Sequence, residues 1–324
     1  MNEPARIASA LELGEVRRVA PFGAGLINDT FLVETNEGDF VLQRVNTDVF
    51  PEPERVMHNV EVVTNHLQGR YVPELVGTQD GVWRAWRRVA GTATNTTPTV
   101  ARVASAARLL AAFHDALADL APERVGETLP RFHDPARRFA ALHEAIDTDA
   151  AGRAASTQVE IEAALAAEPL VALARQLGAE VPQRVAHNDA QLNNVLFRGD
   201  DAVCLVDLDT VMPTAWFWDL GDLLRSASSY GEEDDPDPAH NEVDPALWHA
   251  IVDTYCAAAM RSTAAERVAV THAGIIVTYE QALRFLTDWL AGDVYYRTTR
   301  PGQNLDRVRA QLALLASMRG TVGA

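Results

Sequence analysis

Alternating apolar and polar residues mark three short β-strands near the start of the chain. They are TFLVET (30–35), DFVLQRV (39–45) and GVWRAWRRV (81–89), and turn residues precede the second and third. A period of two is typical of half-buried strands, because successive side chains point to opposite faces of a sheet. Residues 51–67 begin with Pro and Glu and then repeat apolar side chains at helical spacing. The pattern predicts an antiparallel sheet interrupted by one helix.

After a threonine-rich link at 90–99, the pattern becomes helical and rich in alanine. Residues 100–117 place their apolar side chains on one stripe, as an amphipathic helix does. Two apolar runs around a Gly-Asp-Asp turn predict a β-hairpin at 195–209. Further helices are predicted at 135–146, 158–177, 246–260, 265–291 and 303–318. We therefore expect an α+β fold in which a small sheet lobe (1–90) precedes a larger, mostly helical lobe (91–324).

The composition is that of a globular protein, with 48% apolar and 23% charged residues over 324 positions, which is enough for two lobes with proper cores. No uncharged apolar run is long enough to span a membrane, and the N-terminus lacks the basic and apolar regions of a signal peptide. We therefore expect a soluble cytoplasmic protein. Cys204 and Cys256 lie among apolar residues without metal-ligand spacing, which favours buried free thiols.

The net charge of −17 argues against a nucleic-acid partner, because binding phosphates needs clustered Lys and Arg and the chain has no basic run. Anionic membranes are disfavoured for the same reason. The most acidic stretch, GEEDDPDPAHNEVDP (231–245), contains three prolines and predicts an exposed loop. Its acidity would either attract a cationic substrate or keep the protein soluble, and we favour the second. The pattern does not indicate an oligomeric state.

A cluster of polar residues interrupts the apolar pattern between the helical region and the hairpin. His187, Asp189 and Asn194 have the spacing H-x-D-x-x-x-x-N of a kinase catalytic loop, and Asp207 follows at the end of an apolar strand. Phosphoryl transfer needs a carboxylate that accepts the proton of the attacking hydroxyl and oxygen ligands for Mg²⁺. We assign Asp189 as the catalytic base, and Asn194 and Asp207 as metal ligands.

Each of these residues has an ordinary alternative role, since Asp and Asn are common turn formers and helix caps. The combination of three spaced residues with a later acid and an upstream sheet favours catalysis. We expect His187 to brace the backbone of the loop. Asp209 lies two residues beyond Asp207, and it is either a further metal residue or an acceptor contact.

The chain resembles the aminoglycoside phosphotransferase and choline kinase superfamily along essentially its whole length, and within it most resembles N-acetylhexosamine 1-kinases. The likeness is carried by residues 25–33, 40–50, 187–213 and 284–296. It implies a protein-kinase-like fold of two lobes with a hinge at about 86–92, where backbone groups would contact adenine. It also implies that ATP and Mg²⁺ are the cofactors and that the anomeric hydroxyl of N-acetylglucosamine or N-acetylgalactosamine is phosphorylated.

The segment PFGAGLINDTFLV (21–33) suits a glycine-containing loop over nucleotide phosphates, with Gly23 and Gly25 as its glycines. A plain hairpin turn would explain the same residues. In the kinases that the chain resembles, an Asn-Asp pair at this loop reaches the sugar. The resemblance therefore assigns Asp29 to hydroxyl recognition and Asn28 to a supporting role.

Arg44 occupies the strand position at which kinases usually carry a phosphate-binding lysine. Arginine can serve there, because its planar fork gives two hydrogen bonds to phosphate oxygens. The alternative is a surface arginine on an edge strand. We expect Glu61, rather than Glu54, to be the helix glutamate that pairs with Arg44.

Residues 279–299 form an amphipathic helix and its end, with Arg284 and Asp288 one turn apart. A surface ion pair would explain both residues. The resemblance instead assigns Arg284 and Tyr295 to sugar binding, and Tyr295 would stack on the ring or hydrogen-bond to it. His114, on the apolar helix 100–117, is expected to be a core histidine with satisfied hydrogen bonds.

Two other functions remain open at the level of sequence. The first is a kinase of another acceptor, such as an aminoglycoside, choline, homoserine or another sugar. The second is a nucleotide-binding pseudokinase that acts as a scaffold. Pseudokinases usually lack the base or a metal ligand, whereas Asp189, Asn194 and Asp207 are all present here, so catalysis is favoured.

Overall fold

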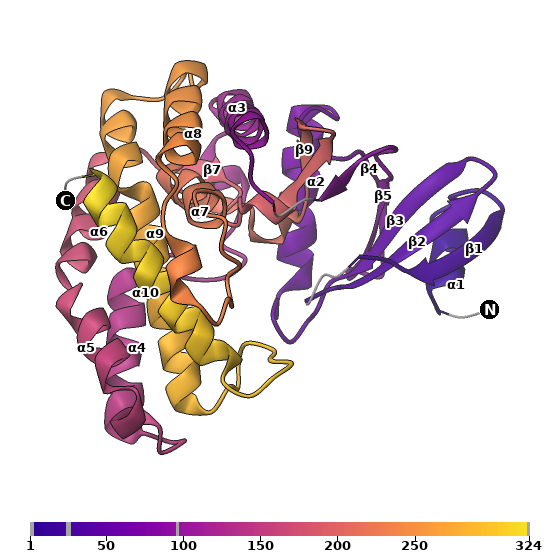
Figure 1. The fold of residues 1–324 in the computed structure, drawn as a ribbon. Coiled ribbons are helices and arrows are strands. Elements are labelled where there is room, and N and C mark those ends of the chain that lie inside the picture. Colours follow the sequence, from indigo (N-terminus) through magenta and orange to yellow (C-terminus); the bar gives the residue numbers. More distant parts are fainter. Residues whose placement is uncertain (1–2, 24–26, 95–96, 323–324) are drawn as a thin grey trace.

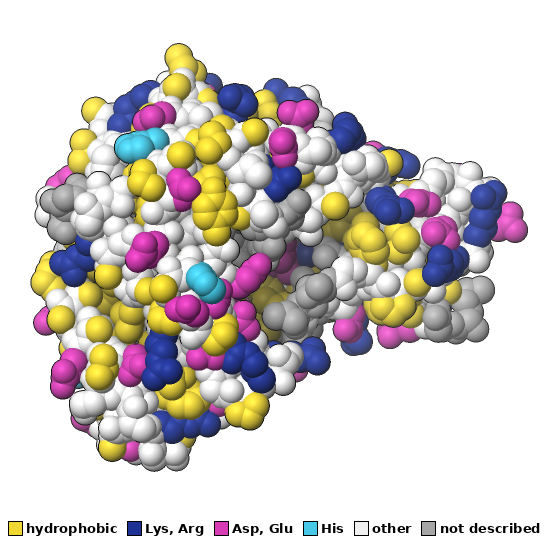
Figure 2. Space-filling view, in the orientation of Figure 1, with side chains coloured by type: hydrophobic (Ala, Val, Ile, Leu, Met, Phe, Trp, Pro, Cys, Tyr) yellow, Lys and Arg dark blue, Asp and Glu magenta, His cyan; other side chains and the backbone are white. Residues whose placement is uncertain are grey.

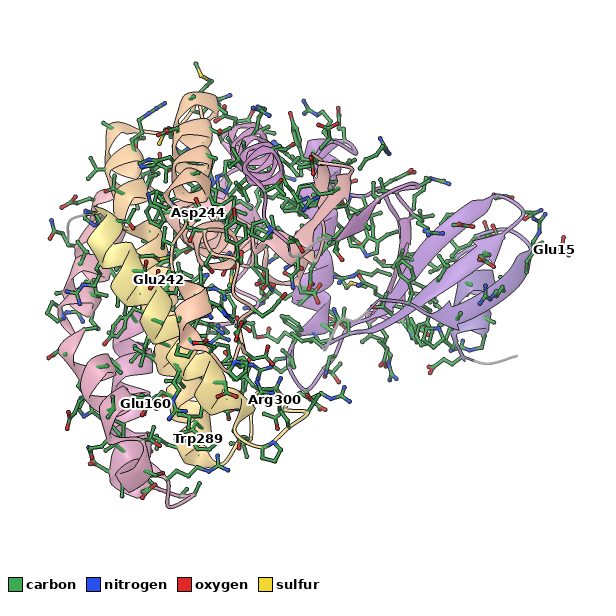
Figure 3. The ribbon with its side chains drawn as sticks, in the orientation of Figure 1. Glu15, Glu160, Glu242, Asp244, Trp289 and Arg300 are labelled. Atoms are coloured by element: carbon green, nitrogen blue, oxygen red, sulfur yellow. The ribbon has the colours of Figure 1, made fainter. Side chains whose placement is uncertain are left out.

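The computed structural model describes residues 3–23, 27–94 and 97–322, and it contains a small sheet lobe beside a larger helical lobe (Figure 1). The surface is hollowed between the two lobes (Figure 2). Glu15 marks the far end of the sheet lobe, whereas Trp289 and Arg300 lie at the lower end of the helical lobe (Figure 3). The arrangement confirms the predicted α+β class.

The small lobe contains five antiparallel strands in the order β1-β2-β3-β5-β4. The strands predicted at 30–35, 39–45 and 81–89 are confirmed to within two residues at each end, whereas β1 and β4 lack a clear alternation and were not predicted. The five strands are β1 (Val16–Pro21), β2 (Asp29–Thr35), β3 (Gly38–Arg44), β4 (Leu75–Gln79) and β5 (Trp83–Arg87).

A short helix that the pattern did not predict, α1 (Glu3–Ala10), covers one face of this sheet. Its Ile7 packs in one apolar cluster with Phe40 and Leu42 of β3. Because side chains alternate along a strand, Gln43 points to the opposite face, toward the helical lobe. The sheet therefore buries apolar side chains under α1 and turns Gln43 toward the helical lobe.

The predicted helix at 51–67 is confirmed as α2 (Pro53–Leu67), which starts with proline in its first turn. Its buried residues, Val60 among them, belong to the apolar cluster of the helical lobe. Asn59 is fully buried and donates through Nδ2 to the carbonyl oxygens of Gly126 (2.6 Å) and Val211 (2.8 Å). Helix α2 is thus built into the core of the second lobe.

The second lobe is organised around the 28-residue helix α9, which contacts α4, α7 and α10. A capping box between Thr263 and Glu266 starts α9, and Gly292 in a left-handed conformation ends it. The single helix predicted at 158–177 is wrong, because the chain turns and a new helix begins at a proline. The helices are α3 (Val100–Leu117), α4 (Pro135–Thr148), α5 (Gln158–Ala166), α6 (Pro169–Glu180), α7 (Phe217–Ala227), α8 (Pro245–Ala258), α9 (Ala264–Ala291) and α10 (Gln303–Val322).

Helix α7 was not predicted, and it crosses α9 at Gly221. A Cβ atom at Gly221 would lie 2.5 Å from a methyl group of Val277 and 2.6 Å from the carbonyl oxygen of Ala273. Only glycine permits this approach of the two backbones. The contact holds α7 firmly beneath the loop described below.

Short strands frame the polar loop of the second lobe. The predicted hairpin is confirmed as β8 (Val195–Arg198) and β9 (Asp201–Leu205), to which β6 (Ala93–Thr94) adds a third strand, while β7 (Arg184–Ala186) pairs with β10 (Met212–Thr214). Both cysteines are free, and Cys204 is buried. Among the residues that the structure describes, no helix is long and apolar enough to cross a membrane.

Candidate active site

The polar loop at 187–194 runs between β7 and β8, and buried polar contacts fix its start. His187 donates through Nε2 to the carbonyl oxygen of Val206 (3.0 Å), which ties the loop to the chain after β9. Asn188 has a positive φ of 64° and donates through Nδ2 to three carbonyl oxygens, those of Ala186, Thr210 and Met212. His187 is therefore a brace, as the sequence predicts.

Asp219 of α7 anchors the backbone of the same loop. Its carboxylate accepts from the amide nitrogens of His187 (2.8 Å) and Asn188 (2.6 Å) and lies 2.8 Å from Nε2 of His114. Burial alone would raise the pKa of Asp219, but the hydrogen bond and charge of His114 lower it below its usual value. His114 also bonds to Tyr255, so its prediction as a satisfied core histidine is confirmed.

Asp189 lies half-buried in the middle of the loop. Its carboxylate accepts hydrogen bonds from Nδ2 of Asn194 (2.8 Å) and Nε2 of Gln191 (3.1 Å). Burial raises the pKa of Asp189 well above its usual value, and the negative charges of Asp222 and Asp207 raise it further. A carboxylate with a raised pKa takes up a proton more readily, as a general base must.

Asn194 and Asp207 offer oxygen atoms toward the same region. Asn194 donates its Nδ2 to Asp189, and the described residues provide no donor to its Oδ1. Asp207 has a positive φ of 66° and directly precedes a short 3-10 turn without a capping hydrogen bond from its side chain, and burial followed by the charge of Asp209 raises its pKa to about 7. The amide oxygen of Asn194 and the carboxylate of Asp207, whose charge is repelled by Asp209, are the kind of oxygen ligands that Mg²⁺ prefers.

This site is not a closed metal cage. Within residues 3–23, 27–94 and 97–322, no group of three or more His, Cys, Asp or Glu side chains is placed to hold a metal ion. Mg²⁺ usually keeps several waters and binds through one or two protein carboxylates together with substrate phosphates. The donor set of Asn194 and Asp207 agrees with a metal that arrives with a nucleotide.

The raised pKa of Asp207 leads to a pH-dependent prediction. Its pKa of about 7 in the fold exceeds the ordinary 3.8, so the stability it contributes is present at acid pH and is lost as the pH rises through 7. Without nucleotide, the unfolding temperature should fall between about pH 5 and about pH 8, and the stabilisation by Mg·ADP should be larger at the upper end. Thermal unfolding with and without Mg·ADP measures both changes. In Asp207→Asn the fall with pH should shrink, and an unchanged fall in that variant would contradict the assignment.

Asp209 faces the sheet lobe. It is 2% exposed, its Oδ2 accepts from Nδ2 of Asn28 (2.6 Å), and its Oδ1 forms an ion pair with Arg84 of β5. Asn28 in turn accepts from the backbone nitrogen of Asn46 (3.0 Å). The neighbouring Asp29 begins β2 and is exposed. The sequence did not single out Arg84, because nothing in the stretch WRAWRR (83–88) distinguishes this buried arginine from the two that follow it.

Arg44 and Glu61 do not contact each other, and neither has a contact with Asp189, Asn194 or Asp207 among the described residues. Arg44 is exposed on the face of the sheet that carries α1, and its guanidinium lies 5.9 Å from the ring of Trp83. Glu61 accepts from Oγ1 of Thr78 (3.1 Å), so the structure places it against β4 and does not pair it with Arg44. The strand residue that faces the cleft is Gln43.

Gly23 and Gly25 are the two glycines of the predicted phosphate loop, and the structure describes the first of them. Gly23 has a φ of 79°, a left-handed conformation that strains other residues, and a Cβ there would meet open space. The prediction for Gly25 lies outside the described residues.

Arg284 lies on α9, close enough to Asp189 for their charges to interact, and Tyr295 follows the end of that helix. Arg284 is half-buried, donates to Oε1 of Gln281 (3.0 Å), and lies over the rings of Phe132 (5.3 Å) and Tyr296 (5.6 Å). Burial alone would lower the pKa of Arg284, but Tyr296, Glu280 and, more weakly, Asp189 raise it. The side chain of Tyr295 is exposed.

Asp288 does not form the surface ion pair with Arg284 that the spacing allows. It is buried, and its carboxylate accepts from the backbone nitrogens of Tyr295 (2.7 Å) and Tyr296 (3.0 Å) and from Asn304 (2.8 Å). Within the described residues no carboxylate lies within 4.0 Å of Arg284. Asp288 thus shapes the chain after α9, and the charge of Arg284 is balanced by longer-range interaction with Glu280 and Asp189, without a direct ion pair.

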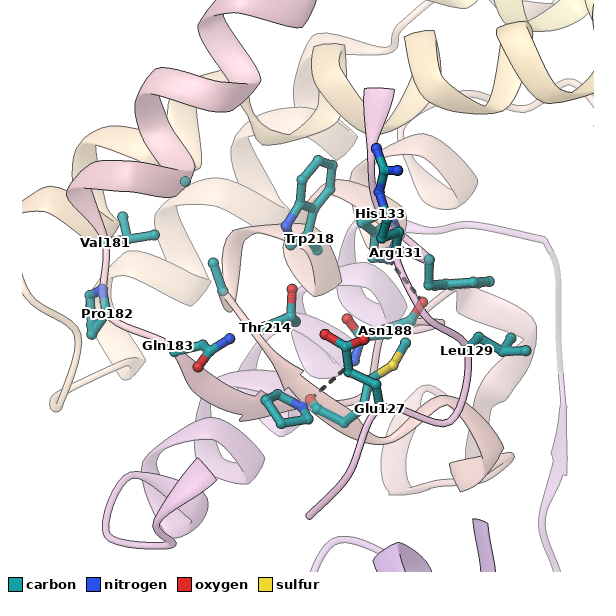
Figure 4. A pocket seen from close by; sticks show the side chains of 15 residues that line it. Glu127, Leu129, Arg131, His133, Val181, Pro182, Gln183, Asn188, Thr214 and Trp218 are labelled. Atoms are coloured by element: carbon teal, nitrogen blue, oxygen red, sulfur yellow. Dashed lines mark hydrogen bonds between the residues drawn. The ribbon is translucent and has the colours of Figure 1, made fainter. Parts of the chain in front are cut away.

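A cavity of about 390 Å³ lies behind the polar loop (Figure 4). Asn188, His133 and Trp218 line it, and His133 contacts the carbonyl oxygen of Asn188 (3.2 Å). Asp189, Asn194 and Asp207 are absent from its lining, so this hollow touches the start of the loop at Asn188 and does not include the candidate catalytic residues.

Comparison with known proteins identifies the family. The sequence model of the phosphotransferase enzyme family matches residues 18–261. The fold is similar to an aminoglycoside phosphotransferase from Alicyclobacillus acidocaldarius, with 16% identity and a TM-score of 0.62 over 97% of this chain and 96% of the other. It is also similar to choline kinase LicA from Streptococcus pneumoniae, with 15% identity and a TM-score of 0.61 over 97% of this chain and 98% of the other. A third similar structure is APH(2")-IIa in complex with streptomycin and ATP, with 16% identity and a TM-score of 0.61 over 98% of this chain and 99% of the other. The chain therefore belongs to the phosphotransferase enzyme family.

Proposed function

We propose that this protein is an ATP- and Mg²⁺-dependent kinase that phosphorylates the anomeric hydroxyl of an N-acetylhexosamine, giving the sugar 1-phosphate. The observation that carries the kinase chemistry is the gathering of Asp189, Asn194 and Asp207 on one anchored loop and the turn that follows it. The similarity in fold to a protein seen with bound ATP agrees with this chemistry.

In the proposed reaction, Asp189 orients the acceptor hydroxyl and takes its proton as the oxygen attacks the γ-phosphorus. Asn194 and Asp207 would hold Mg²⁺, which neutralises charge on the phosphates when it is bound with ATP. Asp219 acts through the backbone by keeping His187 and Asn188 in place. Positioning and charge stabilisation supply most of the catalysis in such transfers, and they require no covalent intermediate.

The charge of Arg284 bears on the acceptor. Choline, ethanolamine and aminoglycosides are cations, and proteins similar in fold are named for them. Here Arg284 is half-buried and close enough to Asp189 for their charges to interact, no described carboxylate forms a direct ion pair with it, and its positive charge would repel a cationic acceptor. Its donors and the adjacent aromatic rings suit a neutral acceptor with hydroxyl and carbonyl oxygens. This favours a neutral sugar such as N-acetylglucosamine or N-acetylgalactosamine.

The test is ADP release with Mg·ATP across N-acetylglucosamine, N-acetylgalactosamine, glucose, galactose, choline, homoserine and an aminoglycoside. We expect turnover with the N-acetyl sugars and phosphate on their anomeric oxygen. Arg284→Gln should raise KM for the sugar by about tenfold or more with a smaller change in kcat, because a charged hydrogen-bond donor is lost. Arg297→Gln, at an exposed position nearby, is the matched control.

Turnover with choline or the aminoglycoside alone would reject the sugar and leave the kinase chemistry standing. Silence with every acceptor would instead favour a nucleotide-binding scaffold. Asp29 and Tyr295, which the resemblance assigns to sugar contacts, are the next residues to change if the sugars are accepted.

A further inference from the structure

Arg84 of β5 lies on the face of the sheet that looks toward the helical lobe. The strand register pairs Gln43 of β3 with Arg84 of β5, and Gln43 accepts from Nε of Arg84 (3.1 Å) and from Nε1 of Trp86 (2.9 Å). These three side chains therefore share the sheet face that looks toward the helical lobe. Arg44 has the opposite orientation.

The side chain of Arg84 is completely shielded from solvent. It is fully buried, and its guanidinium lies 5.4 Å from the ring of Trp86. A buried arginine needs an ionic partner, because an uncompensated charge in the interior is strongly unfavourable. Asp209 is that partner, and it comes from the other lobe.

Asp209 uses both carboxylate oxygens on the sheet lobe. Oδ1 is ion-paired with Arg84 and Oδ2 accepts from Asn28, which also accepts from the backbone of Asn46. One carboxylate of the helical lobe thus joins β5 and the residue just before β2. A carboxylate whose two oxygen atoms are engaged by a guanidinium and an amide in this way is poorly placed to bind Mg²⁺ as well.

We infer that Asp209 is a positioning residue, not a metal ligand, and that with Arg84 and Asn28 it sets how the sheet lobe sits over Asp207 and the bound nucleotide. The inference rests on the proposed kinase function, because it assigns the nucleotide to the cleft between the lobes. It adds to that function a three-residue connection on which the catalytic alignment of the two lobes depends.

The experiment uses the full chain and needs no acceptor. Binding of a non-hydrolysable ATP analogue is measured by calorimetry at saturating Mg²⁺, and the Mg²⁺ concentration for half-maximal binding is measured separately. Asp209→Asn and Arg84→Met should each weaken analogue binding by about tenfold or more and leave the Mg²⁺ requirement within about twofold, because each leaves a buried partner unpaired. Asn28→Asp keeps the acceptor for Asn46 but sets a carboxylate against Asp209, and it should also weaken binding.

The double variant Arg84→Met with Asp209→Asn shows whether the two residues act as a pair or independently. If the two residues act as a pair, it should bind the analogue no more weakly than the worse single variant, because removal of both charges leaves none unpaired. Effects that multiply in the double variant, or a Mg²⁺ requirement that rises in Asp209→Asn alone, would overturn the inference. Thermal unfolding checks that each variant is folded. Since no sugar is present, a failure here is distinct from a failure of the proposed acceptor.

Discussion

Asp189→Asn is expected to lower kcat by about 10²–10⁴-fold, because it removes the group that accepts the proton of the attacking hydroxyl. The substitution keeps the size of the side chain and one oxygen atom that can accept from Asn194 or Gln191. The local structure of the loop should therefore survive, and KM for Mg·ATP should change little. ADP release with the best acceptor of the panel measures the loss.

The same substitution should not destabilise the protein at neutral or alkaline pH. The pKa of Asp189 is raised by burial and by the charges of Asp222 and Asp207, so its ionised form opposes folding above that pKa. Removing the charge should leave the unfolding temperature unchanged or raise it at about pH 8. Asp201→Asn, at an exposed position on the nearby hairpin, is the matched control. Retained turnover in Asp189→Asn would reject Asp189 as the base.

Asp219→Asn is expected to abolish activity and to lower the free energy of unfolding by about 3–5 kcal/mol, the usual cost of breaking a buried charged network. The carboxylate accepts from two backbone amides and contacts His114. An amide side chain can present only one oxygen to these donors, so at least one buried N–H loses its acceptor. Urea unfolding at neutral pH measures the change, and Asp253→Asn on the exposed side of α8 is the control.

The pH dependence distinguishes this effect from a general packing defect. The pKa of Asp219 is lowered in the fold, so its contribution to stability is present above the ordinary value of 3.8 and is lost as the pH falls through the lowered pKa. The stability difference between the wild type and Asp219→Asn should therefore shrink in acid. A difference that stays constant from pH 7 into the acid range would count against the carboxylate as the anchor.

The sequence predicted those elements whose apolar period is undisturbed. The strands at 30–35 and 39–45 and the helix at 51–67 follow from such periods, and the loop residues Asp189 and Asn194 follow from their spacing. Helix α7 was missed, since glycine and two acids interrupt its apolar run. Those interruptions have structural roles, because they provide the close approach to α9 and the anchor of the polar loop at 187–194.

The choice between Gln43 and Arg44 shows a different limit. The two residues are adjacent, so one must face the cleft and the other must face away. Both faces of the sheet are covered, one by α1 and the other by the helical lobe, and the alternation alone does not tell which face is which. Tertiary packing decides the question, and it also brings Arg84 and Asp209 together across 125 positions of sequence.

The burial of α2 in the core of the helical lobe bears on how the protein opens in solution. Because Val60 and its neighbours share a cluster with the second lobe, while α1 and the sheet face beneath it form a cluster of their own, we expect two cooperative units of unequal size. Amide hydrogens of α2 should exchange with deuterium as slowly as those of the helical lobe, whereas those of the outer strands exchange earlier. The line of local unfolding thus runs through the first lobe, between its sheet and its helix.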